Sequence, residues 1–272
     1  EQFFIWISGV LSGDFGTSIS LRQPVLSLVL GRLPATLELS FLALLIACIL
    51  GGTLSLLGTR LRETKIEGII DGINGIAMSI PDFLWGLIFI LLFGVMWPIF
   101  HISGRISPFL DIDYSTQFYL MESILRFDLK VFTDLLAHML MPAVALSIPL
   151  AAIISQLLKQ SLKETMHLDY VTLSRTKGYS ENHVILKEAL PNAVLPTLTL
   201  VGVQFTFLIG GTVIIERLFS YEGLGNMAID AVINRDLPLI QGIVILFALI
   251  FTVVNLLVDL TYTLLNPKLR DG

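Results

Sequence analysis

Long apolar runs separated by short polar segments dominate the chain. The runs cover residues 33–58, 69–100, 134–166, 196–215 and 239–265. An α-helix rises about 1.5 Å per residue, so about 20 apolar residues are enough to cross a hydrocarbon layer about 30 Å thick. The pattern therefore predicts an all-α fold, a polytopic transmembrane helical bundle with five spans.

The first predicted span has a stripe of small side chains along one helical face. Ala43, Ala47, Gly51 and Ser55 recur every four residues. Small side chains let a second helix approach closely, and helices in lipid associate largely through such packing. We therefore expect another helix against this face.

A polar break interrupts the second predicted span at residues 79–82, which read Ser-Ile-Pro-Asp. Proline removes a backbone donor and kinks a helix, so the freed carbonyl groups must face protein or a water-filled cavity instead of lipid. Asp82 adds a carboxylate beside the kink. This combination suggests the lining of a pore.

A polar segment, residues 169–192, separates the third and fourth predicted spans. Its pattern predicts a first short helix that ends at Lys177, with Gly178 free to adopt the left-handed turn that closes a helix. Ser180 can cap a second helix, and Pro191 is expected to mark where that helix meets the next segment. We interpret the segment as a helix-turn-helix elbow.

The elbow is predicted to be amphipathic, with charges that alternate in sign. The apolar residues that could form a docking face are Tyr170, Val171, Leu173, Tyr179, Val184, Ile185 and Leu186. A short amphipathic helix fits the groove of a partner protein, whereas the alternative is a solvated loop that merely links two spans. Spacing alone leaves both readings open. A DNA-reading motif is disfavoured because acids nearly match the bases, so we expect no nucleic-acid partner.

Composition supports a membrane protein and limits its chemistry. The 272 residues are 54% hydrophobic and 14% charged, with a mean hydropathy of +0.82. The single cysteine, Cys48, gives neither a disulfide framework nor a thiolate metal cluster. The histidines lack metal-ligand spacing, and the chain has no GxxxxGK[ST] phosphate-binding loop. We therefore expect no catalytic residue, no metal site and no cofactor in this chain.

Basic residues fall mainly on one side of the predicted topology. With the elbow in the cytoplasm, that side holds ten of the 17 lysine and arginine residues. Cytoplasmic loops carry such an excess, so the chain is expected to start outside and end inside. This topology gives an external N-terminal segment, residues 1–32, and a transmembrane domain, residues 33–272, with its elbow at about residues 167–192.

Acidic residues in or near the spans keep other mechanisms open, because charge in apolar surroundings is costly and tends to be functional. Glu38, Asp71 and Asp259 lie near span ends and favour packing or snorkelling roles, whereas Asp82 is the better pathway candidate. One alternative is a proton-coupled secondary transporter that uses the intramembrane carboxylates Asp82, Asp71 or Asp259. An intramembrane hydrolase is a second alternative, because residues distant in sequence can meet as a triad.

Ten short strings extend in order along nearly the whole chain. They are GDFGTS at Gly13, LPATLEL, SIPDFLWG, ISGR, HMLMPAVAL, DYVTLSRTKG, ALPNAVLP, GLG, DAVINRDLPLIQG and NLLVDLTYTLLNPKLR. In this order they resemble the dipeptide, oligopeptide and nickel class of ABC importer permeases. The resemblance implies a type I ABC importer permease fold, in which an additional N-terminal span precedes the five predicted here.

The cytoplasmic signature of that family falls on the elbow. It reads EAA, three residues, G, nine residues, I, one residue, LP, and Gly178, Leu190 and Pro191 match it. Residues 172–174 replace EAA, and Glu188 replaces the isoleucine. In the proteins that the chain resembles, this elbow is a coupling helix in a groove of an ATPase subunit. The implied ATPase-coupling residues are Asp169, Tyr170, Arg175, Gly178, Leu190 and Pro191.

The resemblance implies a non-enzymatic permease subunit that forms half of a pore in the bacterial inner membrane. Its expected partners are a second homologous permease, two ATP-binding subunits, which would hold ATP and Mg²⁺, and an external solute-binding protein. Candidate residues for the translocation pathway are Ser79, Pro81, Asp82, Trp85 and Gln204. The substrate stays open between dipeptides, oligopeptides, a nickel chelate and another small solute.

Overall fold

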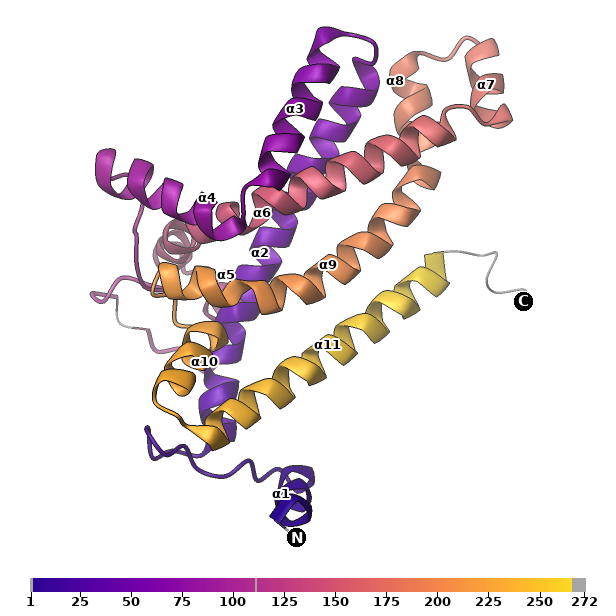
Figure 1. Cartoon of the computed structure of the whole chain (residues 1–272). Helices are drawn as coiled ribbons and strands as arrows, with labels where there is room; N and C mark the ends of the chain where they lie inside the picture. Colours follow the sequence, from indigo (N-terminus) through magenta and orange to yellow (C-terminus); the bar gives the residue numbers. More distant parts are fainter. Residues whose placement is uncertain (1, 111, 266–272) are drawn as a thin grey trace. The chain divides into compact units, whose positions relative to one another are not determined.

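The computed structural model describes residues 2–110 and 112–265, and this part of the chain is helical apart from loops and one isolated β-bridge between Thr17 and Pro24 (Figure 1). Its contacts define two compact units. Unit 1 comprises Glu1–Phe41, Gly86–Ala143 and Phe207–Thr252, and unit 2 comprises Leu42–Trp85, Val144–Thr206 and Val253–Gly272.

Four helices in the described residues are long and apolar enough to cross a membrane. The first two are α2 (Val25–Arg60) and α6 (Leu129–Thr165). The third is the continuous helix Glu181–Leu218, most of which is α9 (Leu190–Leu218), and the fourth is Leu237–Val258 of α11 (Leu237–Leu265). A broken pair, α3 (Lys65–Ser79) with α4 (Asp82–Phe89) and the π-helix η1 (Ile90–Met96), raises the count to five when it is taken as one span. The predicted all-α fold is therefore confirmed, and the five predicted spans correspond to these four helices and the broken pair, which is bent by 98°.

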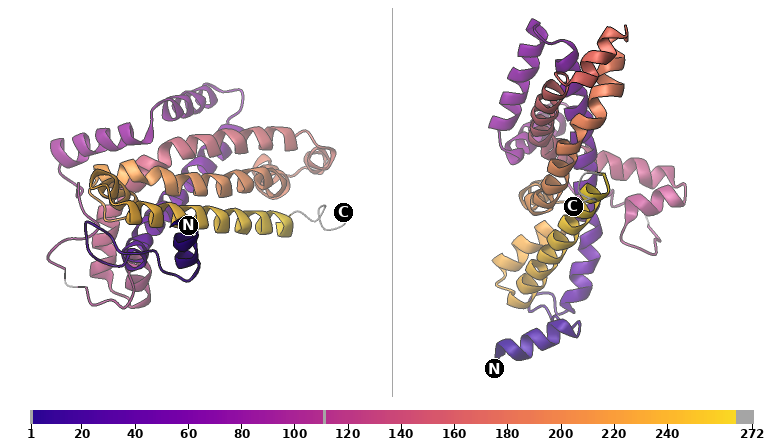
Figure 2. Two further views of the ribbon diagram at one scale, coloured as in Figure 1. Left: turned by 60° about the horizontal axis from the view of Figure 1, so that its bottom comes forward. Right: turned by 90° about the vertical axis from the view of Figure 1, so that its right-hand side faces the viewer.

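Shorter helices connect or flank these spans. They are α1 (Gln2–Leu11), α5 (Tyr119–Leu125), α7 (Asp169–Thr176), α8 (Glu181–His183) with the π-helix η2 (Val184–Ala189), and α10 (Leu224–Ile233). The long connection between η1 and α6, drawn in magenta to pink, contains α5 (Figure 2).

Two helices begin earlier than the spans predicted within them. The helix that holds the first predicted span begins at Val25 instead of residue 33, because Val25 and Val29 are buried in a cluster with Leu239 and other residues that come much later in the chain. The helix that holds the fourth predicted span begins at Glu181, within the elbow, instead of at Pro196, since α8, η2 and α9 form one continuous helix.

Pro191 lies at the junction of η2 and α9, where the predicted second helix meets the next segment, and the helix continues through it. Proline cannot donate a helical hydrogen bond. The π-helical turn η2 ends two residues before Pro191. Such local adjustments help membrane helices to tolerate proline.

A buried carboxylate organises the start of α10 in unit 1. Glu216, which is fully buried, accepts hydrogen bonds from Thr36 Oγ1 at 2.7 Å and from the Asn226 backbone N–H at 3.0 Å. Thr36 Oγ1 in turn accepts a hydrogen bond from the Leu224 N–H at 2.8 Å. Free N–H groups at a helix start are thereby satisfied by side chains of α2 and α9.

The GLG string fits tightly around this carboxylate. A Cβ atom at Gly223 would lie 2.4 Å from Glu216 Oε2, and one at Gly225 would lie 2.5 Å from the Cα atom of Val213. Neither position has room for a side chain. The string therefore has a structural role in unit 1.

A second buried network joins α2 to the segment before α5. Arg105 Nη2 lies 2.7 Å from Glu38 Oε2 and 2.7 Å from the Gln117 carbonyl oxygen. Glu38 Oε1 accepts a hydrogen bond from the Leu120 N–H at 2.8 Å, and the guanidinium lies 4.2 Å from the ring centroid of Tyr119. Glu38, predicted to be a packing residue, is thus half of a buried ion pair.

Two of the motif strings that are far apart in sequence meet in unit 1. Asp236 Oδ2 accepts hydrogen bonds from Ser18 Oγ at 2.5 Å, Ser20 Oγ at 2.7 Å and the Ser20 N–H at 3.0 Å. Burial acts to raise the pKa of Asp236, but these hydrogen bonds outweigh it and hold the pKa well below its usual range. The segment after α1 is thereby attached to the start of α11.

In unit 2 the stripe of small residues on α2 is buried, as expected. A Cβ atom at Gly51 would lie 2.6 Å from the Ala151 carbonyl oxygen and 2.9 Å from the side chain of Ile154. Helix α6 therefore approaches α2 so closely at Gly51 that only glycine fits. The prediction of a neighbouring helix is confirmed there.

Polar side chains also join α3 to α6 in unit 2. Lys159 Nζ lies 2.7 Å from Glu67 Oε1 and 2.8 Å from Asp71 Oδ1. One turn further along α3, Asn74 Nδ2 donates a hydrogen bond to Ser155 Oγ at 3.0 Å. Asp71 is thus neutralised by a lysine, so it is not an isolated carboxylate of the kind that a proton pathway would use.

Candidate functional site

Short sequence features determine the local structure of the elbow. Helix α7 is followed by Lys177 as its C-cap, and Gly178 adopts a left-handed backbone with φ of +84° (Figure 1). Ser180 then caps α8, since its hydroxyl accepts a hydrogen bond from the His183 N–H at 3.4 Å. The predicted helix end, glycine turn and serine cap are confirmed.

The inner face of the elbow is part of a hydrophobic cluster in unit 2. Val171 of α7 is fully buried, as are Val184 and Ala189 of the following helix. The cluster also includes Leu158, Leu162 and Met166 near the end of α6, together with Ile185 and Ala193. Shared burial of this kind joins α6, α7 and the beginning of α9 into one packed body.

Three residues of the predicted docking face are therefore internal. Val171, Val184 and Ile185 pack within the chain and cannot contact a partner. The prediction failed there because an apolar pattern shows which residues avoid water, but not whether the same chain or another one covers them.

Other apolar side chains of the elbow are exposed. The exposed fractions are 48% for Leu168, 38% for Tyr170, 54% for Leu173, 49% for Tyr179 and 48% for Leu186. Four of these five residues belong to the predicted docking face. Leu168 was missed because it precedes the polar segment by one residue. Exposed apolar side chains on a polar segment are typical of an interaction surface.

Polar contacts hold the elbow in shape. Arg175 Nη2 lies 3.1 Å from Glu181 Oε1, across the Gly178 turn, and Arg62 Nη2 lies 3.7 Å from the same oxygen. Asn192 Nδ2 donates a hydrogen bond to Tyr170 Oη at 2.7 Å. Arg175 and Tyr170, which we predicted to contact an ATPase, thus make contacts within the chain. Their partners, Glu181 and Asn192, could not be identified from the sequence pattern.

The remaining predicted coupling residues lie around the same turn. Asp169 is exposed in the first turn of α7, where a negative charge is favoured by the helix dipole. Leu190 is half-buried against the hydrophobic cluster, and Pro191 is exposed beside it. The structure brings the six predicted residues to one segment of unit 2, and their contact with an ATPase stays a prediction.

The predicted pathway residues lie in two places. The break is confirmed, because Ile80 has an extended backbone between α3 and α4. Ser79 Oγ donates to the Gly75 carbonyl oxygen at 2.7 Å, and Asp82 Oδ1 accepts from the Phe83 N–H at 2.7 Å. The exposed Pro81 separates them.

Trp85 and Gln204 complete the predicted pathway set. Trp85 lines an apolar pocket in unit 2, and Gln204 is half-buried on α9. Whether these residues contact a transported solute stays a prediction. The side chain of Asp259, named with Asp71 and Asp82 for a proton-coupled mechanism, lies outside the described residues.

The long apolar helices are those of a multi-pass membrane protein. Residues 43–271 match the family described as binding-protein-dependent transport system inner membrane component. The chain belongs to this family. Within the described residues, no group of three or more histidine, cysteine, aspartate or glutamate side chains could hold a metal ion.

Several curated relatives are similar over nearly the whole chain. The dipeptide transport system permease protein DppB of Escherichia coli (strain K12) is 37% identical, covering 99% of this chain and 80% of the relative. The di/tripeptide transport system permease protein DppB of Pseudomonas aeruginosa (strain UCBPP-PA14) is 36% identical over the same shares. DppB of Lactococcus lactis subsp. cremoris (strain MG1363) is 30% identical, again over 99% and 80%.

Solved structures share the fold. An inward-facing structure of the MetNI methionine ABC transporter matches with a TM-score of 0.68 at 15% identity, covering 88% of this chain and 96% of that chain. A crystal structure of an amino acid ABC transporter with histidines matches with a TM-score of 0.60 at 16% identity, covering 87% and 93%. The predicted type I ABC importer permease fold is thereby confirmed.

Proposed function

We propose that this chain is one permease subunit of an ATP-driven, binding-protein-dependent peptide importer in the bacterial inner membrane. The elbow is the observation that carries the proposal, because it presents exposed apolar residues on a rigid body that also includes the ends of two membrane helices. Similarity to dipeptide permeases over 99% of the chain supports peptides as the substrate class.

The proposed partners follow from the same elbow and family. A second homologous permease completes the pore, two ATPase subunits bind ATP and Mg²⁺, and an external solute-binding protein delivers the peptide. The elbow faces the cytoplasm and docks in a groove of one ATPase.

Coupling is mechanical in this proposal. When ATP draws the ATPases together, they displace α7, and the hydrophobic cluster transmits that displacement to α6 and α9. The spans then tilt between outward-facing and inward-facing arrangements. This chain binds and moves but performs no covalent chemistry, and its substrate passes through the pore without modification.

Purification from the native membrane tests the proposal. The chain is tagged at its C-terminus and extracted in mild detergent, and the proteins that accompany it are identified by mass spectrometry. We expect a second permease and P-loop ATPases. Recovery of the chain alone, with transport that follows a proton gradient and ignores ATP, would establish the secondary-transporter alternative instead.

Replacement of Gly178 by valine is expected to lower ATPase recovery about tenfold. A left-handed backbone costs an L-residue about 1–2 kcal/mol, and a β-branched side chain suits it least. Because no atom lies within 4 Å of a Cβ placed at Gly178, the loss comes from backbone strain and not from a clash. The measurement is the amount of ATPase that co-purifies per tagged chain.

Gly178→Asn is the matched control, since asparagine tolerates the left-handed region. We expect this variant to retain most of the ATPase. Equal recovery with valine, asparagine and glycine would show that the turn geometry does not matter for coupling.

Replacement of Leu173 by glutamate is expected to abolish ATPase recovery without destabilising the chain. Leu173 is 54% exposed on α7, so a carboxylate there remains solvated in the free chain but loses solvation in an apolar groove. The control is Leu125→Glu on α5, whose side chain is 69% exposed but lies outside the elbow. Loss of ATPase from both variants would contradict a specific elbow contact.

A further inference from the structure

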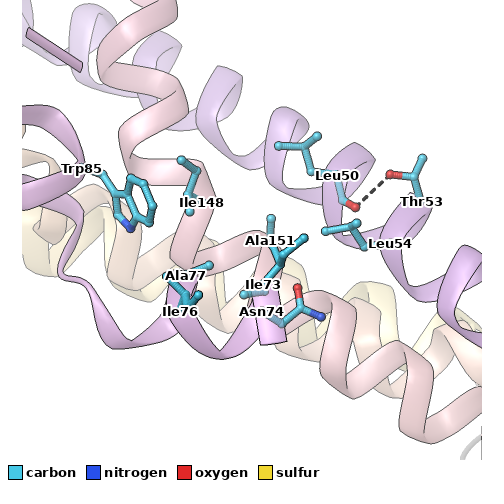
Figure 3. Close-up of a pocket in the computed structure, with 11 residues that line it drawn as sticks. Leu50, Thr53, Leu54, Ile73, Asn74, Ile76, Ala77, Trp85, Ile148 and Ala151 are labelled. Carbon is cyan, nitrogen blue, oxygen red and sulfur yellow. Dashed lines mark hydrogen bonds between the residues drawn. The ribbon is translucent and has the colours of Figure 1, made fainter. Parts of the chain in front are cut away.

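An apolar pocket of about 360 Å³ lies within unit 2, lined by residues of α2, α3, α6 and the start of α4 (Figure 3). Ala77, Trp85 and Ile148 contribute to its walls. Its volume is within the range of small-molecule sites, and its lining is overwhelmingly apolar. Trp85 is a predicted pathway residue, but the proposed coupling and peptide transport assign no role to the other residues that line the pocket.

The rim of the pocket faces outward between membrane helices. Ile73 and Ile76, both on α3, are 51% and 60% exposed, although they are apolar. Helices α2 and α6, which form the opposite walls, are long and apolar enough to span a bilayer. In the membrane placement of the proposed function, this rim faces lipid.

Charged residues define the depth of the pocket in the bilayer. Lys159 pairs with Glu67 and Asp71, and such charges remain near the aqueous interface. Asn74 follows Asp71 by three residues, which is about 4.5 Å along the helix axis. One end of the pocket therefore lies at headgroup depth, and the rest extends toward the acyl chains.

Asn74 places a polar acceptor on the pocket wall. Its side chain is 1% exposed, and its Nδ2 donates to Ser155 Oγ at 3.0 Å. Its Oδ1 has no hydrogen-bond partner among the residues that the structure describes. An unpaired buried acceptor is unfavourable, most of all where water is scarce. A guest that donates a hydrogen bond to Asn74 would remove this penalty.

We propose that the pocket binds one membrane phospholipid with a donor-bearing headgroup, such as phosphatidylethanolamine. An acyl chain fills the apolar volume beside Ala77 and Trp85, and the ammonium donates a hydrogen bond to Asn74 Oδ1. A phosphatidylcholine with the same acyl chains fits the volume but lacks the donor. The proposal requires only that the chain lies in a bilayer, so it stands apart from the peptide substrate and the ATPase contact.

Native mass spectrometry of the purified complex, or of the full-length chain if it purifies alone, tests the proposal. After exhaustive detergent exchange, phosphatidylethanolamine or phosphatidylcholine with identical acyl chains is added back, and retained lipid is counted. One net hydrogen bond corresponds to about fivefold in affinity, so we expect about fivefold preference for phosphatidylethanolamine. Equal retention of the two lipids would overturn the proposal.

Two variants locate the site. Asn74→Leu removes the acceptor at similar volume and is expected to abolish the headgroup preference, whereas Ala77→Phe fills the pocket and is expected to remove the bound lipid altogether. Ile69→Phe is the matched control, because Ile69 is 59% exposed on the same helix and does not line the pocket. If Ala77→Phe does not fold, the lipid preference of Asn74→Leu still tests whether the headgroup binds at Asn74. A preference that persists in Asn74→Leu would place the lipid elsewhere.

Discussion

Replacement of Glu216 by leucine is expected to destabilise unit 1 by about 2–6 kcal/mol, enough to prevent accumulation of folded protein. The variant leaves the Thr36 hydroxyl and the Asn226 N–H without their shared acceptor in a fully buried site. Each buried donor left unsatisfied costs about 1–3 kcal/mol. The measurement is the yield of monodisperse protein in mild detergent and its thermal midpoint.

Glu216→Gln is the matched control, since its carbonyl oxygen can still accept from one of the two donors. We expect an intermediate thermal midpoint. Gly225→Ala tests the same region through packing, because its Cβ would lie 2.5 Å from the backbone of Val213. A leucine variant as stable as the wild type would show that the carboxylate contributes nothing to the placement of α10.

The second large loss of stability is expected when the ion pair between Glu38 and Arg105 is broken. Arg105→Leu leaves Glu38 as an uncompensated charge in a site where both side chains are at most 7% exposed. Removal of one partner from a buried ion pair costs about 3–5 kcal/mol. We expect a lower thermal midpoint and a more protease-sensitive segment between η1 and α5, measured in detergent with the tagged chain.

The double variant Glu38→Leu with Arg105→Leu separates charge from packing. Because it leaves neither charge unpaired, we expect it to be more stable than Arg105→Leu alone. Destabilisation that is simply additive in the double variant would mean that the two residues act independently.

Local signals explain which parts of the elbow were predictable. Gly178 and Ser180 act through their own backbone and immediate neighbours, so the sequence alone locates the turn and the cap. Which apolar residues the elbow exposes depends on the hydrophobic cluster with the end of α6, which includes Val171, whereas Leu173 is 54% exposed. Tertiary contacts therefore determine which of these side chains are exposed, and no local sequence pattern encodes those contacts.

The membrane spans also have some features that the local sequence predicts and others that depend on distant residues. Their number follows from hydropathy, because a lipid layer demands long apolar helices whatever their neighbours. The early start of α2 depends on burial of Val25 against residues such as Leu239, and the ion pair of Glu38 depends on Arg105 in a later loop. Sequence identified Glu38 as unusual, but its partner is 67 residues away.

The hydrogen bond between Thr36 and Glu216 also has a consequence for biosynthesis. Thr36 is translated 180 residues before Glu216, a delay of about 10–40 s at bacterial-type elongation rates of about 5–20 residues per second. During that interval α2 is already made while the carboxylate and the N–H groups of α10 that Thr36 will bind do not yet exist. Insertion of this permease therefore leaves the Thr36 hydroxyl of α2 without its native partners until α9 and α10 have been made.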